Sequence, residues 1–190
     1  MAGMDIRIAG SGGQGVILCS IILADAALAH DKYAAQSQSY GPEARGGTCK
    51  AEVVISDEPI TFPKVEKSDF LLALTQDALE KYVAQTKPGS IVMYDDSLTP
   101  PEGTDLQYVA APIISIARDS VKRIMVSNMV AVGVINSYLN IVDYDTLEEV
   151  ALRNVPKGTE DANRFALFEG SKVKLSVRDN KELDYVSYYW

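Results

Sequence analysis

The chain has 190 residues, of which 47% are hydrophobic and 23% charged, a composition that suits a globular protein able to build its own core. Its net charge of −8 argues against nucleic-acid binding and against attachment to an anionic membrane surface. Two cysteines and one histidine are too few for a four-cysteine iron–sulfur site, for a four-ligand zinc site, or for a disulfide framework.

The N-terminal residues do not resemble a targeting signal. Residues 1–7 lack a basic region that leads into an apolar stretch. The longest apolar run, residues 16–23, is too short to span a bilayer. We therefore expect a soluble cytoplasmic protein.

The first quarter of the chain is predicted to fold as strand, turn, helix and strand. Residues 5–9 alternate between polar and apolar side chains, as a short strand does. Residues 10–15 (GSGGQG) form a glycine-rich turn, and residues 16–29 are apolar nearly all round, which predicts a buried helix. Residues 32–38 are predicted to form the second strand, and residues 39–47 a loop broken by proline and glycine.

The middle of the chain indicates a parallel sheet. Residues 48–56 alternate, which predicts a strand at an edge or with one solvated face. Residues 68–75 and 90–94 are short apolar strands with a helical segment, 76–85, between them. This order is typical of a βαβ unit. Residues 106–111 form a further strand, which the following proline ends.

The last third is predicted to be helical. Residues 118–140 carry an apolar, core-facing stripe at helical spacing, formed by Val121, Ile124, Met125, Val132, Ile135 and Leu139. Residues 145–153 and 161–168 form two shorter helices. No repeat or long linker divides the chain, so residues 1–190 are predicted to be one domain. We predict an α/β fold: a three-layer α/β/α sandwich with a mostly parallel central sheet and a Rossmann-like opening β-turn-α unit.

The glycine turn is the first candidate site. Gly10, Gly12 and Gly15 satisfy G-x-G-x-x-G, in which missing side chains let backbone N–H groups approach a phosphate at a helix N-terminus. A dinucleotide site also needs an acidic residue about twenty positions on, and Asp31, the nearest, precedes the second strand. The structural alternative is a tight turn without a ligand. Either way, we expect Gly12→Ala to damage the turn by restricting φ.

The loop after the second strand is the second candidate site. It places an aromatic ring, a carboxylate and a guanidinium (Tyr40, Glu43 and Arg45) between glycines. Arginine suits bidentate contacts to phosphate or carboxylate, and functional residues often lie on loops. The alternative is a local Glu43–Arg45 ion pair in solvent.

These two motifs carry a resemblance to a known family. GSGGQG at residues 10–15 and SYGPEARGG at residues 39–47, together with Asn128 and Met129, resemble the gamma subunit of 2-oxoacid:ferredoxin oxidoreductases. The form of the second motif is most similar to the 2-oxoglutarate branch.

The resemblance implies a part in a larger enzyme of anaerobic metabolism. Such enzymes oxidatively decarboxylate a 2-oxoacid, transfer the acyl group to coenzyme A and pass electrons to ferredoxin. Thiamine diphosphate, Mg²⁺ and iron–sulfur clusters would lie in alpha, beta and delta type partner subunits. This chain would be inactive alone and would hold no catalytic residue and no metal. It would help to form the coenzyme A and subunit-interface region through Gly10, Gly12, Gly13, Gln14, Gly15, Tyr40, Gly41, Glu43, Arg45, Gly46, Gly47 and Asn128.

Two alternatives from other classes stay open. One is a stand-alone Rossmann-type NAD(P)-binding oxidoreductase, which the missing ribose-binding acid argues against. The other is a non-catalytic scaffold domain, which the Arg45 loop argues against. Neither the 2-oxoacid nor the stoichiometry of the complex follows from the residues alone.

Several other residues have structural interpretations. His30 is predicted to cap the first helix, and Cys19 to be a buried small hydrophobe. Asn128 either braces a nearby loop or points at a ligand, because a buried amide needs hydrogen-bond partners. Asp95 and Asp96 follow a strand end, where they either bind a ligand or cap a turn.

The C-terminal residues 171–190 are a candidate partner-contacting tail. Three tyrosines and the only tryptophan lie in the last six residues. Aromatic anchors are enriched at protein interfaces. The alternative is that this tail packs on its own domain.

Overall fold

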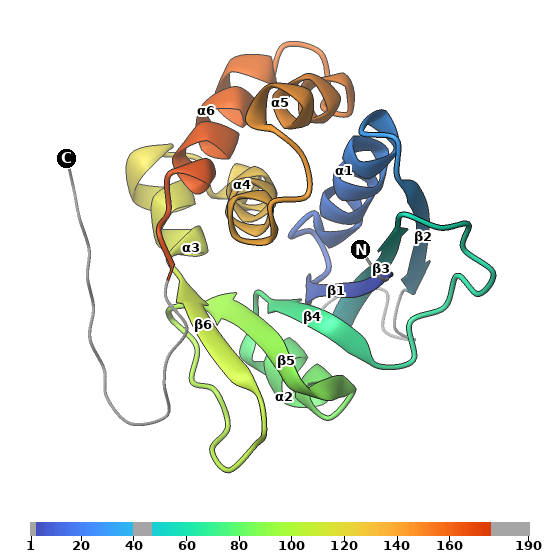
Figure 1. The fold of residues 1–190 in the computed structure, drawn as a ribbon. Coiled ribbons are helices and arrows are strands. Elements are labelled where there is room, and N and C mark those ends of the chain that lie inside the picture. The colour runs from blue at the N-terminus through green and yellow to red at the C-terminus, as the bar shows by residue number, and fades with distance from the viewer. Residues whose placement is uncertain (1–2, 40–46, 176–190) are drawn as a thin grey trace.

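A six-stranded sheet organises the molecule (Figure 1). The computed structural model describes residues 3–39 and 47–175. The strands lie in the order β2-β3-β1-β4-β5-β6. Their bounds are Met4–Ser11 (β1), Tyr33–Ser39 (β2), Thr48–Ser56 (β3), Ser68–Ala73 (β4), Thr86–Asp95 (β5) and Gln107–Ala111 (β6).

The sheet is mostly parallel, as predicted. Strands β1, β4, β5 and β6 pair in parallel, whereas β3 is antiparallel to both of its neighbours. Strand β4, helix α2 (Gln76–Val83) and β5 form the predicted βαβ unit. The opening β-turn-α unit is also confirmed, but β3 lies between β1 and β2, so the strand after the first helix does not pair with β1.

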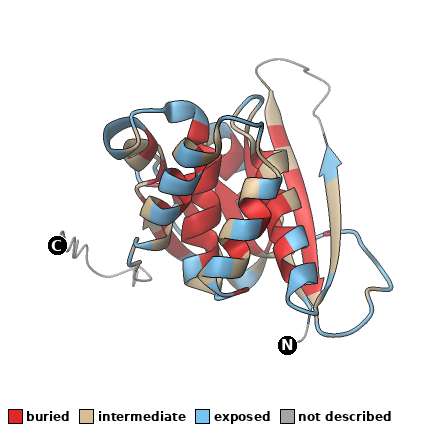
Figure 2. Ribbon diagram, turned by 90° about the horizontal axis from the view of Figure 1, so that it is seen from above, coloured by how far each residue is buried: buried red, intermediate tan, exposed pale blue. Residues whose placement is uncertain are grey.

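Helices cover the two faces of the sheet unequally. Helices α1 (Val16–Ala29), α4 (Ser127–Leu139), α5 (Tyr144–Arg153) and α6 (Glu160–Ser171) lie on one face, and α2 lies on the other (Figure 1). The predicted three-layer sandwich is therefore present, with one thick layer and one thin layer. Figure 2 shows buried residues between the helices and the sheet, while the outer strand β2 is mostly half-buried or exposed.

Helix α1 has the predicted bounds because its apolar side chains face the core nearly all round. Eight of its fourteen residues are buried. His30 ends the helix as predicted, since its backbone N–H donates to the carbonyls of Ala27 and Leu28. Among the described residues, no helix is long and apolar enough to cross a bilayer.

The prediction of an edge or half-solvated strand at residues 48–56 is wrong. Strand β3 lies inside the sheet, and residues 51–55 are all buried. The alternation predicted a solvated face because it includes Glu52, but this carboxylate is buried and paired with two cations. It accepts hydrogen bonds from Arg7 Nε at 2.8 Å and Lys50 Nζ at 2.7 Å.

The prediction of one helix over residues 118–140 is wrong in its first third. A short α-turn, Ile113–Ser115, runs into a π-helical turn, Ile116–Ser120, and a 3₁₀ turn, Ile124–Val126, precedes α4. Lys122 has φ 61°, a left-handed conformation that interrupts a right-handed helix. Ile124 and Met125 are therefore 54% and 80% exposed instead of facing the core.

Helices α4 and α6 cross with their backbones in contact. A Cβ atom on Gly133 would meet the carbonyl oxygen of Leu167, and one on Gly170 would meet that of Val130. Glycine at both positions permits this close approach. The contact fixes α4 above the sheet and so sets the position of Asn128 in its first turn.

The description of the chain ends shortly after α6. Val173 and Leu175 are partly buried against the main hydrophobic core. Most of the predicted tail, including its aromatic residues, lies outside the described residues. The assignment of residues 1–190 to one domain stays a prediction.

Candidate functional site

The glycine turn lies at the point where the connections that follow two neighbouring strands run to opposite faces of the sheet. After β1 the chain passes to α1, on the face that α4 covers, and after β4 it passes to α2, on the opposite face (Figure 1). Strands β1 and β4 are parallel neighbours, so both helices begin at the same edge of the sheet. In open α/β sheets, ligands bind at such a switch point, outside the carboxyl ends of the strands.

Two glycines give the turn its shape. Gly13 has φ 93° and Gly15 has φ 72°, both left-handed conformations that favour glycine. A Cβ atom on Gly15 would also lie 2.7 Å from Nδ2 of Asn128. Gly12 has an ordinary φ, and a Cβ atom there would meet no atom of the described residues within 4 Å, so the expectation that restricting φ in Gly12→Ala would damage the turn is wrong.

Gln14 braces the turn from within. Its Oε1 accepts a hydrogen bond from the backbone N–H of Ser11 at 2.7 Å, and its Nε2 donates to the carbonyl of Leu74 at 3.4 Å. A Cβ atom on Gly10 would collide with Oε1 of Gln14. Gly10 therefore makes room for this amide, which ties the end of β1 to the end of β4.

Asn128 covers the glycine turn on the α4 side. It is buried in the first turn of α4 and packs against Gly15. Its carbonyl accepts a hydrogen bond from Sγ of Cys19 at 3.3 Å. Within residues 3–39 and 47–175, its side-chain amide has no hydrogen-bond partner. Asn128 therefore packs against the glycine turn, and a contact from its amide to a ligand stays a prediction.

A cleft opens beside the turn on the α4 face. Its volume is about 360 Å³. It is lined by Gly13, Gln14, Leu74, Ser97, Ile114, Ile124, Met125 and Ser127. Its lining is mostly apolar side chains and glycine-turn backbone, which suits a ligand with an apolar arm and a polar end.

The second motif connects the end of β2 to the start of β3. Both of these strand ends lie at the edge of the sheet formed by the carboxyl ends of the parallel strands, as the glycine turn does. Ser39 ends β2 and Thr48 begins β3, and Thr48 lies opposite Ser11, the last residue of β1. Gly47 is half-buried beside Thr48. The predicted site residues Tyr40, Gly41, Glu43, Arg45 and Gly46 lie outside the described residues. The Thr48 end of this segment is nevertheless next to the glycine turn, and the Ser39 end lies one strand further away, because Ser39 pairs with Lys50 of β3.

The carboxylate of Asp95 caps the turn that follows β5. Asp95 is fully buried and accepts hydrogen bonds from Ser97 and from the backbone N–H of Ile114, the latter at 2.7 Å. Burial and the neighbouring Asp95 carboxylate raise the pKa of Asp96. Among the residues that the structure describes, no group of three His, Cys, Asp or Glu side chains could hold a metal ion. The interpretation of Asp95 as a turn cap is confirmed.

Cys19 and His30 have structural roles. Cys19 is fully buried in α1, and burial raises the pKa of its thiol to about 12, so it is a protonated small hydrophobe as predicted. His30 lies at the opposite end of α1 from the glycine turn, with its Nδ1 atom 4.0 Å from Oδ2 of Asp143.

The structure shows two further groups that the sequence patterns did not reveal. Arg7 is fully buried, and its guanidinium donates to Glu52 and to the carbonyls of Gln85 and Val65. Lys81 of α2 donates to Oγ1 of Thr48 at 2.8 Å. The sequence did contain one signal for Arg7, because a charged residue within a short apolar strand indicates a buried, paired charge. The Lys81 contact joins residues 33 positions apart, so no local pattern predicts it.

Comparison with known proteins identifies the family. The family model described as pyruvate ferredoxin/flavodoxin oxidoreductase matches residues 5–173. This chain belongs to that family. The match spans the glycine turn, the second motif and the helices that the structure describes, which confirms the resemblance found in the sequence.

The relatives place the chain in one branch of the family. The 2-oxoglutarate synthase subunit KorC of Methanocaldococcus jannaschii is 46% identical over 174 residues, which cover 89% of this chain and 92% of the relative. KorC of Methanothermobacter marburgensis is 41% identical, with 89% and 95% covered. The pyruvate synthase subunit PorC of the same species is 27% identical, with 86% and 93% covered.

Solved structures share the fold. The gamma subunit of a keto/oxoacid ferredoxin oxidoreductase from Geobacter sulfurreducens superposes with a TM-score of 0.80 at 40% identity, covering 90% of this chain and 95% of that one. The 2-oxoglutarate:ferredoxin oxidoreductase of Magnetococcus marinus, solved with 2-oxoglutarate, coenzyme A and succinyl-CoA bound, also has a TM-score of 0.80 at 25% identity. There, 90% of this chain matches 31% of the longer chain.

Proposed function

We propose that this chain is the gamma-type subunit of a 2-oxoglutarate:ferredoxin oxidoreductase. The observation that carries the proposal is the 41–46% identity to 2-oxoglutarate synthase subunits over nearly their whole length. The complex converts 2-oxoglutarate and coenzyme A to succinyl-CoA and CO₂, and it passes two electrons to ferredoxin. The comparisons give no support to a stand-alone NAD(P)-dependent enzyme or to a non-catalytic scaffold.

The partner subunits supply the chemistry in this proposal. Thiamine diphosphate, Mg²⁺ and iron–sulfur clusters belong to alpha, beta and delta type subunits, and the assembled complex works in the cytoplasm. The role of this chain is to bind and orient coenzyme A at the junction with those subunits.

The glycine turn supports a role in binding phosphate groups. The first N–H groups of α1 have no partner within the helix, and the helix dipole makes its N-terminus favourable for anions. The first turn of α1 has no acidic residue that would compete for this position. The Asn128 amide lies against Gly15, where it can add a donor. Phosphates would bind at the turn, and the apolar cleft would receive the thiol arm.

The test of the proposed function is isolation from the native host under strict anoxia. We would identify the co-purifying chains and measure 2-oxoglutarate-dependent, coenzyme A-dependent reduction of viologen, with pyruvate tested beside it. Thiamine- and cluster-binding subunits that co-purify with 2-oxoglutarate activity would support the proposal. A chain that purifies alone, while the activity runs in another fraction, would overturn it.

Arg45 provides a prediction for the second motif. If its guanidinium binds a phosphate of coenzyme A, Arg45→Ala in the assembled enzyme should raise the KM for coenzyme A about 10- to 100-fold, since a hydrogen bond to a charged group contributes about 1.5–3 kcal/mol. The matched control is Arg153→Ala, which removes an exposed arginine that pairs with Glu149 on α5. Equal KM values in the two variants would remove this role from Arg45.

The tail provides a prediction for assembly. We propose that residues 171–190 contact a partner subunit through their terminal aromatic side chains, as the composition indicates. A chain shortened by residues 185–190 should keep its circular dichroism spectrum and lose co-purification with the partner subunits. Unchanged assembly of the folded, shortened chain would contradict the proposal.

A further inference from the structure

Three cations surround one aromatic ring on the α2 face of the sheet. The Tyr82 ring centroid lies 5.5 Å from Cζ of Arg7, 6.0 Å from Nζ of Lys50 and 5.5 Å from Nζ of Lys81. The carboxylate of Glu52 pairs with Arg7 and with Lys50, at 2.7 Å each. This group of side chains therefore has an excess of positive charge in a chain whose net charge is −8.

Lys81 carries the part of this charge that faces solvent. Its side chain is exposed, and its Nζ atom is held by the hydrogen bond to Oγ1 of Thr48. No carboxylate in the described part of the chain forms an ion pair with it, and the neighbouring Glu80 instead accepts from Gln76 at 2.9 Å. Half-buried Lys87, by contrast, bridges Asp5 and Asp69 at 3.0 and 2.8 Å.

The position of Lys81 links it to the glycine turn. Thr48 is the first residue of β3 and lies opposite Ser11, where β1 enters the turn. Thr48 also comes directly after the second motif in the chain. The ammonium group is therefore fixed at the edge where both motifs meet, on the α2 face, whereas the apolar cleft opens on the α4 face.

We propose that Lys81 is an additional anion-binding residue of this site, which binds a phosphate group at the nucleotide end of coenzyme A. This inference rests on the proposed function, because it takes coenzyme A to be the ligand at the turn. A lysine ammonium is a compact point charge that suits phosphate, and holding it in place lowers the entropic cost of binding. A coenzyme A molecule that lies over the carboxyl-end edge of the sheet, from the α4 face to the α2 face, would place its thiol arm in the cleft. Its phosphates would then lie between the glycine turn and Lys81.

The experiment compares Lys81 variants in the assembled complex. Lys81→Met removes the charge and keeps most of the side chain, whereas Lys81→Arg keeps the charge. We expect Lys81→Met to raise the KM for coenzyme A about tenfold, as loss of one charged contact does. It should raise the inhibition constant of adenosine 3′,5′-bisphosphate by a similar factor and leave the KM for 2-oxoglutarate unchanged. Lys81→Arg should restore most of the affinity.

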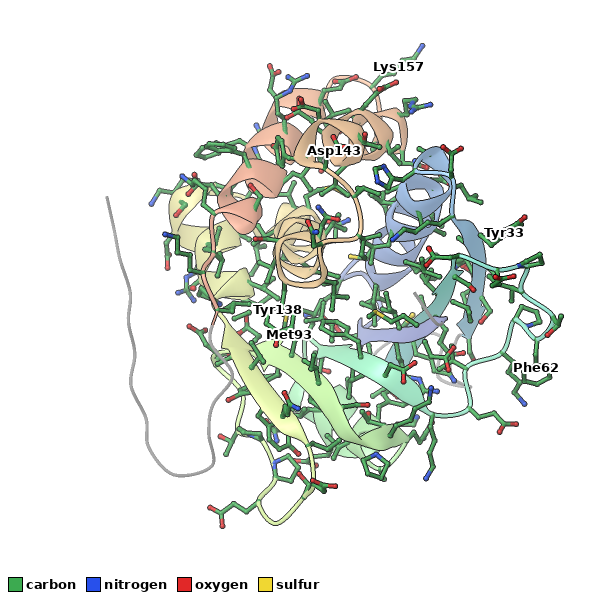
Figure 3. All side chains as sticks on the ribbon, in the orientation of Figure 1. Tyr33, Phe62, Met93, Tyr138, Asp143 and Lys157 are labelled. Carbon is green, nitrogen blue, oxygen red and sulfur yellow. The ribbon has the colours of Figure 1, made fainter. Side chains whose placement is uncertain are left out.

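Lys157→Met is the matched control. Lys157 is an exposed lysine between α5 and α6, at the far end of the molecule from the sheet edge (Figure 3). Thr48→Val is the second control, because it removes the acceptor that holds Lys81 and leaves the charge. A phosphate-binding role predicts a smaller effect for Thr48→Val than for Lys81→Met.

The outcomes separate this inference from the proposed function. If Gly15→Ala raises the KM for coenzyme A and Lys81→Met does not, the role of Lys81 is overturned and the site stands. If neither variant changes it, coenzyme A binds elsewhere and the proposed function of the turn fails. If Lys81→Met changes the KM for coenzyme A but not the inhibition constant of the bisphosphate, Lys81 braces β3 and does not bind phosphate.

Discussion

Replacing Arg7 by alanine should lower the free energy of unfolding by about 3–5 kcal/mol, because it leaves one side of a buried ion pair without its partner. The guanidinium is 0% exposed. It donates to Glu52 of β3 and to the carbonyls of Gln85 and Val65, so it joins three segments that are far apart in the chain. Its loss leaves the carboxylate with Lys50 and leaves both carbonyls without this donor.

Chemical denaturation of the isolated, folded chain measures this effect. The control is Arg118→Ala, since Arg118 pairs with Asp119 on the surface and should contribute about 0–1 kcal/mol. A double variant, Arg7→Met with Glu52→Leu, should recover much of the loss because it removes both charges together. If Arg7→Ala costs no more than Arg118→Ala, the buried pair does not stabilise this face of the sheet.

The strands and the glycine turn could be predicted because their signals are local. The bounds of α1 and β3 match the predicted ranges, since each follows from apolar patterning between glycine, proline and polar residues. The parallel βαβ unit followed from the order of strand and helix. Gln14 and Gly15 could be assigned to the turn by their spacing, but the hydrogen bond from Gln14 to Leu74 could not.

The side of the cleft that Ile114, Ile124 and Met125 form could not be predicted, because it depends on contacts between residues that are distant in the chain. Ile124 and Met125 have helical spacing, yet they line the cleft instead of the core. The buried Asp95 carboxylate accepts from the N–H of Ile114, and Lys122 interrupts the helical path. Neither effect has a local signature, so periodicity alone predicted a single long helix.

The cationic group at the α2 face was missed for the same reason. Arg7 and Glu52 are 45 positions apart, and the register of β1 against β3 makes them direct neighbours. Alternation in β3 indicated a solvated face because a lone glutamate in a strand ordinarily faces water. The position of an arginine on the adjacent strand changes that conclusion.

A series of single alanine substitutions in the glycine turn should separate backbone strain from side-chain collision. Gly12→Ala should leave coenzyme A binding within about twofold of the original, because its φ is ordinary and no atom of residues 3–39 or 47–175 lies within 4 Å of the new Cβ. Gly13→Ala adds left-handed strain, at a cost of about 1–2 kcal/mol, and its new Cβ meets no atom of the described part of the chain within 4 Å.

Gly15→Ala should have the largest effect in this series. Its Cβ would lie 2.7–2.9 Å from three atoms of the Asn128 side chain, and the left-handed strain is added to this collision. Because α4 is fixed by its backbone contact with α6, Asn128 cannot retreat with its helix, so the turn must open. We expect the KM for coenzyme A to rise at least tenfold in the assembled enzyme, more than for Gly13→Ala.

Asn128→Ala combined with Gly15→Ala tests the cause of this effect. The smaller side chain removes the collision and leaves the strain, so the double variant should bind coenzyme A about as Asn128→Ala combined with Gly13→Ala does, since both double variants lack the Asn128 amide. Thermal unfolding of each complex distinguishes loss of the site from loss of the fold. If Gly15→Ala and Gly12→Ala have the same KM, the turn tolerates a side chain against Asn128, and its backbone is not the part of this subunit that binds the phosphates.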